Sequence, residues 1–198
     1  AVAMPLPALW IASGQLEAPL AQVHAEDIGS GAVILSGSCS AMTRAQVAAY
    51  AAQAPSFRLD PVTLAQDGPG AALAWLERQA FDDAPLIYAT AEPEAVQRAQ
   101  STLGRDHAGA LVEEALAACA IAARDRGARR IVVAGGETSG AVTQALGVTR
   151  LDIGAEIAPG VPWTYADSAG QRIALALKSG NFGAETFIAD ALARLEVA

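Results

Sequence analysis

The chain has 198 residues, with 13 Lys and Arg against 21 Asp and Glu, so its formal net charge at pH 7 is −8. A negative chain without a basic cluster lacks the positive surface that nucleic-acid binding requires, which excludes that class of partner. Hydrophobic residues make up 53% and charged residues 17%, a composition that excludes intrinsic disorder and suits one domain with a single core. Two cysteines cannot build a disulfide framework or a cysteine-rich zinc site, so a cytoplasmic location is expected.

The N-terminal stretch lacks the features of a membrane span or a signal peptide. Residues 1–16 carry no charge, but Pro5 and Pro7 interrupt them and they are too short to cross a bilayer. They also lack the basic start of a signal peptide, so we predict no membrane segment. The first residue is Ala1 rather than Met, from which we expect the sequence to be a piece of a longer protein.

Apolar runs typical of strands alternate with helical spacings along the chain. The run at 32–35 (AVIL) predicts a buried strand, and residues 43–54 form an amphipathic pattern with Ser40 or Thr43 as the N-cap. The predicted elements are, in order, a strand at 32–35, a helix at 43–54, a strand at 57–60, a helix at 69–80, a strand at 85–89, helices at 93–101 and 108–126, a strand at 130–134, a helix at 138–146, strands at 151–157 and 172–177, and a helix at 184–195.

Strands separated by helices imply right-handed crossover connections and a mostly parallel sheet. We therefore predict an α/β fold with three layers, in which helices flank the sheet, and a single domain over residues 1–198. The stretch 151–177 is less regular, because Pro159, Gly160 and Pro162 mark a turn between two strands. This part of the sheet is accordingly expected to be antiparallel.

Three junctions between a strand and the next helix share one composition. We call residues 36–40 (SGSCS) the first loop, residues 135–140 (GGETSG) the second loop and residues 178–183 (KSGNFG) the third loop. The carboxyl ends of parallel strands meet at one edge of a sheet, which is where ligands bind in open α/β folds. The three loops are therefore expected to lie together and to form one site.

The chemistry of these loops suits an anion. Glycines let the backbone approach a ligand closely, and the first turn of a following helix presents free N–H groups whose dipole favours negative charge. Ser and Thr hydroxyls add neutral donors, so a chain of net charge −8 can bind phosphate without a basic patch. The alternative is that these junctions are ordinary turns and helix caps.

Two standard phosphate-binding motifs do not fit. Gly135 and Gly140 have the spacing of a P-loop, but Ala141 and Val142 stand where its lysine and hydroxyl residue belong. A Rossmann fingerprint also fails, because Glu137 occupies the position of its second glycine.

The three loops, with Thr-Arg-Ala-Gln at 43–46 after the first, resemble the motifs of the four-carbon acid sugar kinase family. Members of that family resemble ATP-dependent kinases of 3-oxo-tetronate, threonate or erythronate, with an N-terminal domain for the sugar acid and a C-terminal domain for ATP. The resemblance covers residues 9–195 and lies in the C-terminal domain only. A Gly-Gly-Ser-Gly stretch usual in the family is reduced here to Ile11–Gly14.

The resemblance implies an α/β nucleotide-binding domain that uses ATP with Mg²⁺, and a sugar acid bound through an N-terminal domain that this sequence lacks. It implies nucleotide contacts at Ser38, Gly135, Gly136, Glu137, Thr138, Ser139, Gly180 and Asn181. The isolated chain is expected to be inactive as a kinase, and a homo-oligomer stays open.

Three of the candidate residues have more than one interpretation. Ser38 can donate to a phosphate or ribose, or it can cap a helix. Glu137 can hold Mg²⁺, accept from ribose hydroxyls, or serve as an acidic residue in the first turn of a helix. Lys178, the only lysine of the chain, can pair with a β- or γ-phosphate, or it can be an exposed lysine at a strand end.

Two other functions remain open on the sequence alone. The chain could be a stand-alone nucleotide-binding or regulatory module without catalysis. It could also be an unrelated α/β enzyme that uses the same loops for the phosphate of a sugar phosphate.

Overall fold

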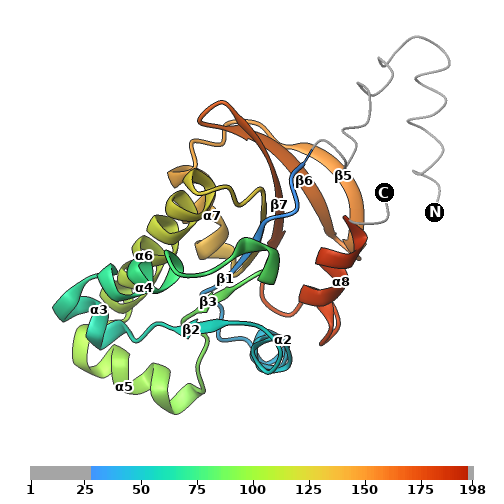
Figure 1. Ribbon diagram of the computed structural model, residues 1–198. Helices are drawn as coiled ribbons and strands as arrows, with labels where there is room; N and C mark the ends of the chain where they lie inside the picture. Colours follow the sequence, from blue (N-terminus) through green and yellow to red (C-terminus); the bar gives the residue numbers. More distant parts are fainter. Residues whose placement is uncertain (1–27, 196–198) are drawn as a thin grey trace, which may run out of the picture.

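The computed structural model describes residues 28–195, which form a sheet covered by helices on both faces (Figure 1). Residues Ile11–Gly14, considered above, lie outside the described residues. The elements are β1 (Ala32–Ser36), α2 (Ala41–Ala51), β2 (Ser56–Arg58), α3 (Pro61–Asp67), α4 (Gly70–Leu76), the 3₁₀ turn η2 (Phe81–Asp83), β3 (Leu86–Tyr88), α5 (Pro93–Leu103), α6 (Arg105–Asp125), β4 (Arg130–Ala134), α7 (Gly136–Ala145), β5 (Asp152–Ala158), β6 (Val161–Ser168), β7 (Gln171–Lys178) and α8 (Phe187–Arg194).

The seven strands form one sheet in the order β2-β3-β1-β4-β7-β6-β5. The strands β2, β3, β1, β4 and β7 are parallel to their neighbours in this order. The pairs β7–β6 and β6–β5 are antiparallel. The predicted α/β class with a partly antiparallel sheet is therefore confirmed. Because β1, β4 and β7 are neighbours, the loops that follow them start side by side at the carboxyl edge.

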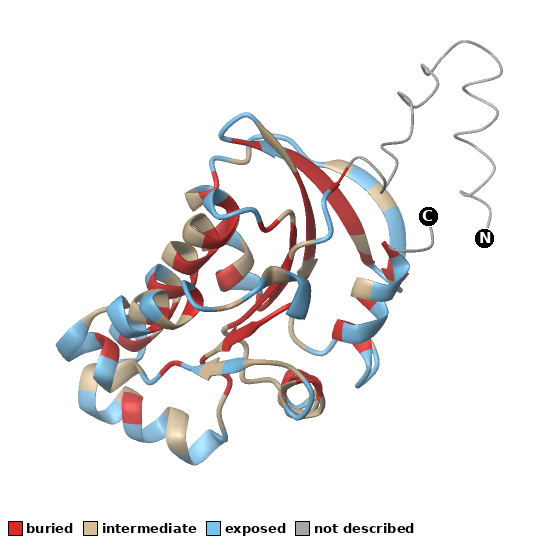
Figure 2. Ribbon diagram, viewed as in Figure 1, coloured by how far each residue is buried: buried red, intermediate tan, exposed pale blue. Residues whose placement is uncertain are grey.

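Alternation along the central strands divides the core between the two faces of the sheet. In β1, Val33 and Leu35 pack with α3, α4, α6 and α7, whereas Ile34 packs on the other face with α2 and α8. Side chains with a period of two point to opposite faces, so a strand buried on both faces is apolar throughout. Figure 2 shows the central strands of the sheet as the most buried part of the molecule, with exposed residues on the outer surfaces of the helices and on the edge strand β5.

Besides the 3₁₀ turn η2, two elements are absent from the series predicted from the sequence. The helix α3 begins at the N-cap Asp60, whose side chain accepts from the backbone N–H groups of Val62 and Thr63, with Pro61 in the first turn. The strand β6 occupies residues 161–168, because Pro162 stands within the strand rather than ending it. The predicted turn at 159–162 is therefore shorter than expected.

The remaining differences lie at the ends of helices and strands, as in β2, which covers Ser56–Arg58 instead of 57–60. Ser40 caps α2, which therefore begins at Ala41 instead of Thr43, and α7 begins at Gly136 instead of Thr138. Among the described residues, the longest helices are not apolar enough over a sufficient length to cross a membrane.

Candidate functional site

Backbone hydrogen bonds join the three loops to one another. The amides of Gly37 and Ser38 in the first loop donate to Ala134 O at the end of β4, over 3.0 and 3.1 Å. The amide of Gly135 in the second loop donates to Lys178 O at the end of β7, over 2.8 Å. The loops therefore form one continuous rim along the carboxyl edge of β1, β4 and β7.

Thr138 fixes the contact between the first and second loops. Its side chain is buried between Gly37 and Gly135, and a Cβ atom on either glycine would collide with Thr138 Oγ1. Gly135 also has φ of 136°, in the region that disfavours side chains. Glycine is therefore required at both positions by the close approach of the two loops.

The second loop leads into a helix whose start has no side-chain cap. Gly135 is the N-cap residue of α7 and offers no side-chain oxygen to the first N–H groups. The first amides of a helix have no partner within the helix, and the dipole there favours an anion. Gly136, Glu137 and Thr138 provide these amides and line the cavity described below.

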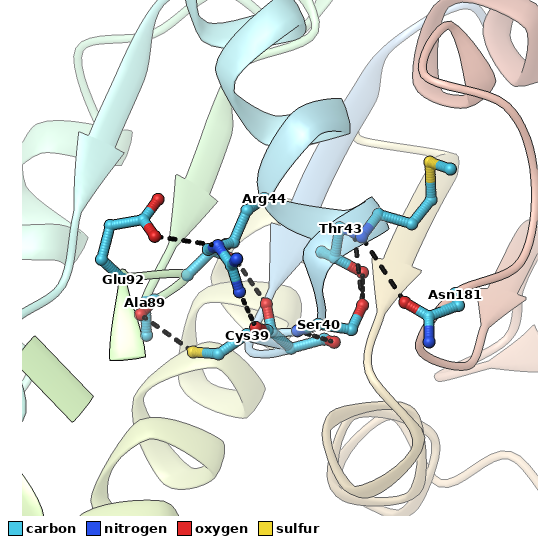
Figure 3. A network of polar contacts seen from close by, with 10 residues as sticks. Cys39, Ser40, Thr43, Arg44, Ala89, Glu92 and Asn181 are labelled. Carbon is cyan, nitrogen blue, oxygen red and sulfur yellow. Dashed lines mark hydrogen bonds and ion pairs between the residues drawn. The ribbon is translucent and has the colours of Figure 1, made fainter. Parts of the chain in front are cut away.

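The third loop is held by side chains of α2. Thr43 Oγ1 donates to Gly180 O over 2.9 Å, and Gln46 Nε2 donates to Phe182 O and Ala184 O over 3.0 and 2.8 Å. The amide of Met42 donates to the side chain of Asn181 over 3.5 Å (Figure 3). Since α2 begins directly after the first loop, it ties the third loop to the first.

Lys178 is the first residue of the third loop, and its side chain turns back beneath the rest of the loop. Its ammonium donates to Gly180 O over 2.5 Å and to Thr43 Oγ1 over 3.0 Å, and the side chain is fully buried. Its Nζ atom also lies 6.0 Å from the centroid of the Phe187 ring. It makes no ion pair with the described residues. Burial lowers the pKa of Lys178 from 10.5 to about 8 because the charged form loses its hydration. The alternative of an exposed lysine at the strand end is therefore wrong.

Buried hydroxyls hold the first loop against the end of β3. Thr90 Oγ1 donates to Ser38 O over 2.9 Å and lies 2.7 Å from Ser36 Oγ. Because the single Thr90 proton goes to Ser38 O, Ser36 is the donor of the other bond. Arg44 adds a bond to Cys39 O over 2.8 Å and an ion pair with Glu92 over 3.2 Å (Figure 3).

A cavity of about 820 Å³ opens beside this rim. One end is lined by the first and second loops and by Gly180. The other end runs between α5, α6 and the start of α3, with Val96, Ala99 and Val112 among its apolar residues. The cavity thus has one end with free backbone donors, the polar end, and a second end of mixed lining, where Arg58, Asp60, Gln100, Arg105 and Asp106 accompany the apolar side chains.

Two carboxylates that influence one another line the cavity. Glu113 of α6 and Glu137 of α7 both line the cavity. The pKa of Glu113 is raised, first by partial burial and second by the negative charge of Glu137. Two adjacent carboxylates repel a bare phosphate but accept hydrogen bonds from hydroxyl groups or bind a cation.

The sequence-predicted residues divide into two groups. Six of them line the cavity, namely Ser38, Gly135, Gly136, Glu137, Thr138 and Gly180. Lys178, Asn181 and Ser139 do not line it. Both Lys178 and Asn181 belong to the third loop, where Lys178 donates to Gly180 O and Asn181 accepts from the amide of Met42 in α2. The hydroxyl of Ser139 is buried without a hydrogen-bond partner among the described residues. Direct nucleotide contacts remain predictions for all nine.

Sequence reasoning missed the residues that support the rim and form the far wall. Thr43 and Gln46 lie inside the Thr-Arg-Ala-Gln segment, which signalled their importance without showing what they bind. Thr90 and Glu113 gave no local signal, because each reaches the site through tertiary packing.

Comparison with known proteins bears directly on this site. A family model described as a nucleotide-binding C-terminal domain matches residues 33–188. The chain belongs to this family. The match contains all three loops, α2 and the walls of the cavity, and it confirms the resemblance to the C-terminal domain of four-carbon acid sugar kinases.

Curated relatives of this nucleotide-binding C-terminal domain carry one name. The chain is 48% identical to a 3-oxo-tetronate kinase of Burkholderia multivorans, over 98% of this chain and 46% of that protein. It is 51% identical to a 3-oxo-tetronate kinase of Pseudomonas fluorescens, over 85% of this chain and 39% of that protein. The chain thus spans less than half the length of these relatives.

Solved structures show the same fold. A Haemophilus influenzae protein from a family of unknown function superposes with a TM-score of 0.78 at 39% identity, over 85% of this chain and 41% of that protein. A Bordetella bronchiseptica protein, solved as a domain-swapped dimer with bound citrate, is 22% identical with a TM-score of 0.64, over 83% of this chain and 41% of that protein. This second likeness shows the fold alone.

Proposed function

We propose that this chain is the ATP-binding domain of a kinase that phosphorylates a four-carbon sugar acid of the 3-oxo-tetronate type. The observation that carries the proposal is the uncapped start of α7 at the polar end of the cavity, inside a chain that belongs to a nucleotide-binding family. The names of the curated relatives support the sugar-acid class. Membership of this family also disfavours an unrelated enzyme of sugar-phosphate metabolism.

In this proposal the polar end of the cavity binds the phosphates of ATP. The amides of Gly136, Glu137 and Thr138 donate to phosphate oxygens, and the hydroxyl of Ser38 adds a further donor from the first loop. Gly180 brings the third loop to the opposite side, where Thr43 and Lys178 hold its carbonyl in place. The chain's contribution is then positioning, which is the main part of catalysis in phosphoryl transfer.

Glu137 is the residue of the described chain that fits Mg²⁺ best. It is exposed in the first turn of α7, beside the proposed phosphates, and a magnesium ion is commonly held by one or two carboxylates with substrate phosphates and water. The described residues contain no group of three or more His, Cys, Asp or Glu that could hold a metal ion by themselves. When bound, Mg²⁺ neutralises phosphate charge, and Glu137 would orient it.

The sugar acid would bind through a second domain. The relatives are more than twice as long as the part that this chain matches, which supports an N-terminal sugar-acid-binding domain in the complete kinase. We therefore expect the chain alone to bind nucleotide without phosphorylating a sugar acid. We propose that the two domains bind the two substrates separately and that the complete kinase is cytoplasmic.

Thermal unfolding with and without ligands tests the nucleotide site. A ligand at 100 times its Kd stabilises a protein by about 2.7 kcal/mol. For a chain of this length that raises Tm by roughly 5–10 °C. We expect such a rise with ATP or ADP in the presence of Mg²⁺. A rise with a sugar phosphate but none with either nucleotide would refute the proposal.

A further inference from the structure

A buried arginine lies at the edge of the sheet opposite to the three loops. Arg130 is the first residue of β4, whereas the second loop follows Ala134, the last residue of this strand. At about 3.3 Å per residue, β4 separates Arg130 from the second loop by roughly 13 Å. Arg130 therefore belongs to the amino edge of the sheet, where the parallel strands begin, and not to the proposed phosphate site.

Arg130 is buried without a compensating charge. Only 8% of the residue is exposed, and its Nε atom has no hydrogen-bond partner in the described part of the chain. It also makes no ion pair with any residue of the range 28–195. A buried arginine is ordinarily paired, because a charge removed from water without a partner is very unfavourable. Since the residue keeps a small exposed surface, it is open to a partner from outside this range.

The neighbouring strands leave room around Arg130. Alanines stand in register with it on both sides, Ala32 in β1 and Ala174 in β7, and Tyr165 of β6 follows next beyond Ala174. These side chains share the face that α2 and α8 cover, because residues in register point to the same side of a sheet. Burial raises the pKa of Tyr165, and the positive charges of Arg130 and Arg172 act in the opposite direction. The phenol of Tyr165 is therefore within electrostatic reach of both arginines.

The aspartates on this face are paired with other arginines. Arg172 donates to Asp152 over 2.5 Å and to Asp167 over 3.4 Å. Arg150 also donates to Asp152, over 3.0 Å. Together with Arg130 this group has three positive and two negative charges, so one positive charge is uncompensated among the described residues. That charge is on Arg130, which is also the most buried of the three arginines.

We propose that Arg130 and Tyr165 form a carboxylate-binding site at the amino edge of the sheet. A carboxylate has the single negative charge that this group lacks, and its two oxygens match two parallel N–H donors of a guanidinium. The hydroxyl of Tyr165 adds a further donor. The carboxylate comes either from a free organic acid or from the chain itself, since Glu26 and Asp27 precede Ile28, which is buried on the same face. The site is independent of the proposed nucleotide function.

Nuclear magnetic resonance of the full chain tests this site. The Nε–H signal of Arg130, assigned through the backbone of β4, is followed while sodium acetate is added. Sodium chloride at equal ionic strength and inorganic phosphate are the comparison salts. The same titrations are carried out on the double variant Glu26→Gln/Asp27→Asn. Tyr165→Phe is then made in whichever protein responds, with Tyr88→Phe as the matched control, because Tyr88 lies in β3 on the same face and is not a neighbour of Arg130.

The two sources of the carboxylate give different results. If it is a free acid, acetate shifts the Arg130 signal of the unchanged chain. If the chain supplies it, acetate shifts the signal only in the double variant, whose starting signal already differs from that of the unchanged chain. In either case Tyr165→Phe should weaken acetate binding by about tenfold, and Tyr88→Phe should leave it unchanged.

Three results would overturn the site. The first is an Arg130 signal that acetate shifts neither in the unchanged chain nor in the double variant. The second is an equal response to chloride or phosphate, which would show that the site does not select a carboxylate. The third is an acetate affinity that Tyr165→Phe leaves as it was, which would exclude the phenol as a donor.

Discussion

The buried ammonium of Lys178 makes a prediction that can be measured without any ligand. Burial lowers its pKa to about 8, against 10.5 for the free side chain. Between these two values the unfolded chain carries a proton that the folded chain has released. Stability therefore rises with pH across this window, because raising the pH removes a charge whose burial is unfavourable.

The size of the effect follows from the two pKa values. The full difference between 10.5 and about 8 corresponds to roughly 3 kcal/mol of unfolding free energy. About 2.5 kcal/mol of this should be gained between pH 7 and pH 10. Tyr50 and Cys119 act in the opposite direction, because burial raises the pKa of each to about 12 and keeps it neutral in the folded state.

A variant separates Lys178 from these other groups. Urea unfolding of the unchanged chain and of Lys178→Met, each at pH 7 and pH 10, gives four free energies, and their double difference isolates the lysine. We expect the unchanged chain to gain about 2.5 kcal/mol relative to the variant on going to pH 10.

The chain contains one lysine, so the pKa can also be read directly. With lysine labelled by ¹³C, the ε-carbon signal belongs to Lys178 alone and should titrate near pH 8 in the folded protein. A midpoint near the ordinary value of a lysine, or a double difference close to zero, would show that the ammonium is hydrated. The description of Lys178 as a buried support of the third loop would then be wrong.

Three substitutions at the rim test its parts separately. Gly136→Val should keep the fold, since Gly136 is exposed and an added Cβ would approach nothing closer than 3.7 Å. It should weaken ATP binding by at least about tenfold, and an unchanged ATP affinity in titration calorimetry would contradict this. Glu137→Gln should reduce the factor by which ATP binds more tightly in Mg²⁺ than in EDTA, and it should lower the pKa of Glu113. If Mg²⁺ strengthens ATP binding to the variant as much as to the unchanged chain, the Glu137 carboxylate is not a cation ligand. Thr43→Val should cost about 1–3 kcal/mol in urea unfolding, whereas the exposed control Thr102→Val should cost less than about 0.5 kcal/mol.

Periodicity was sufficient to predict the parallel core. The strands β1, β4 and β7 are short apolar runs followed by glycine-containing loops, and the resulting order at the carboxyl edge places all three loops together. Local signals also existed for the helix α3, since Asp60 and Pro61 form a standard N-terminal pair, yet the short helix was missed. The strand β6 is not predicted, because a proline after Pro159 and Gly160 is typical of a turn, although proline is tolerated near a strand's start.

The burial of Lys178 could not be predicted in the same way. Nothing in the third loop shows that the side chain turns back beneath Gly180, because its partner Thr43 lies 135 residues earlier in the sequence. The far wall of the cavity is equally non-local, as α5 and α6 reach the rim only through packing on the sheet. Motifs therefore located the polar end of the site, and tertiary structure was needed for the rest.

Several unfavourable features of this fold lie around one cavity. Gly135 has φ of 136° at an uncapped helix start, and Gly109 is a glycine inside the continuous helix α6. The pKa of Glu113 is raised by burial and by Glu137, and Lys178 is buried without an ion pair to the described residues. Local costs that cluster in this way are typical of functional sites, where binding and not stability is selected. Removing a cost should then stabilise the chain. Gly109→Ala and Glu113→Gln are each expected to raise Tm without improving ATP affinity, and a lower Tm in both would contradict the argument that function explains these residues.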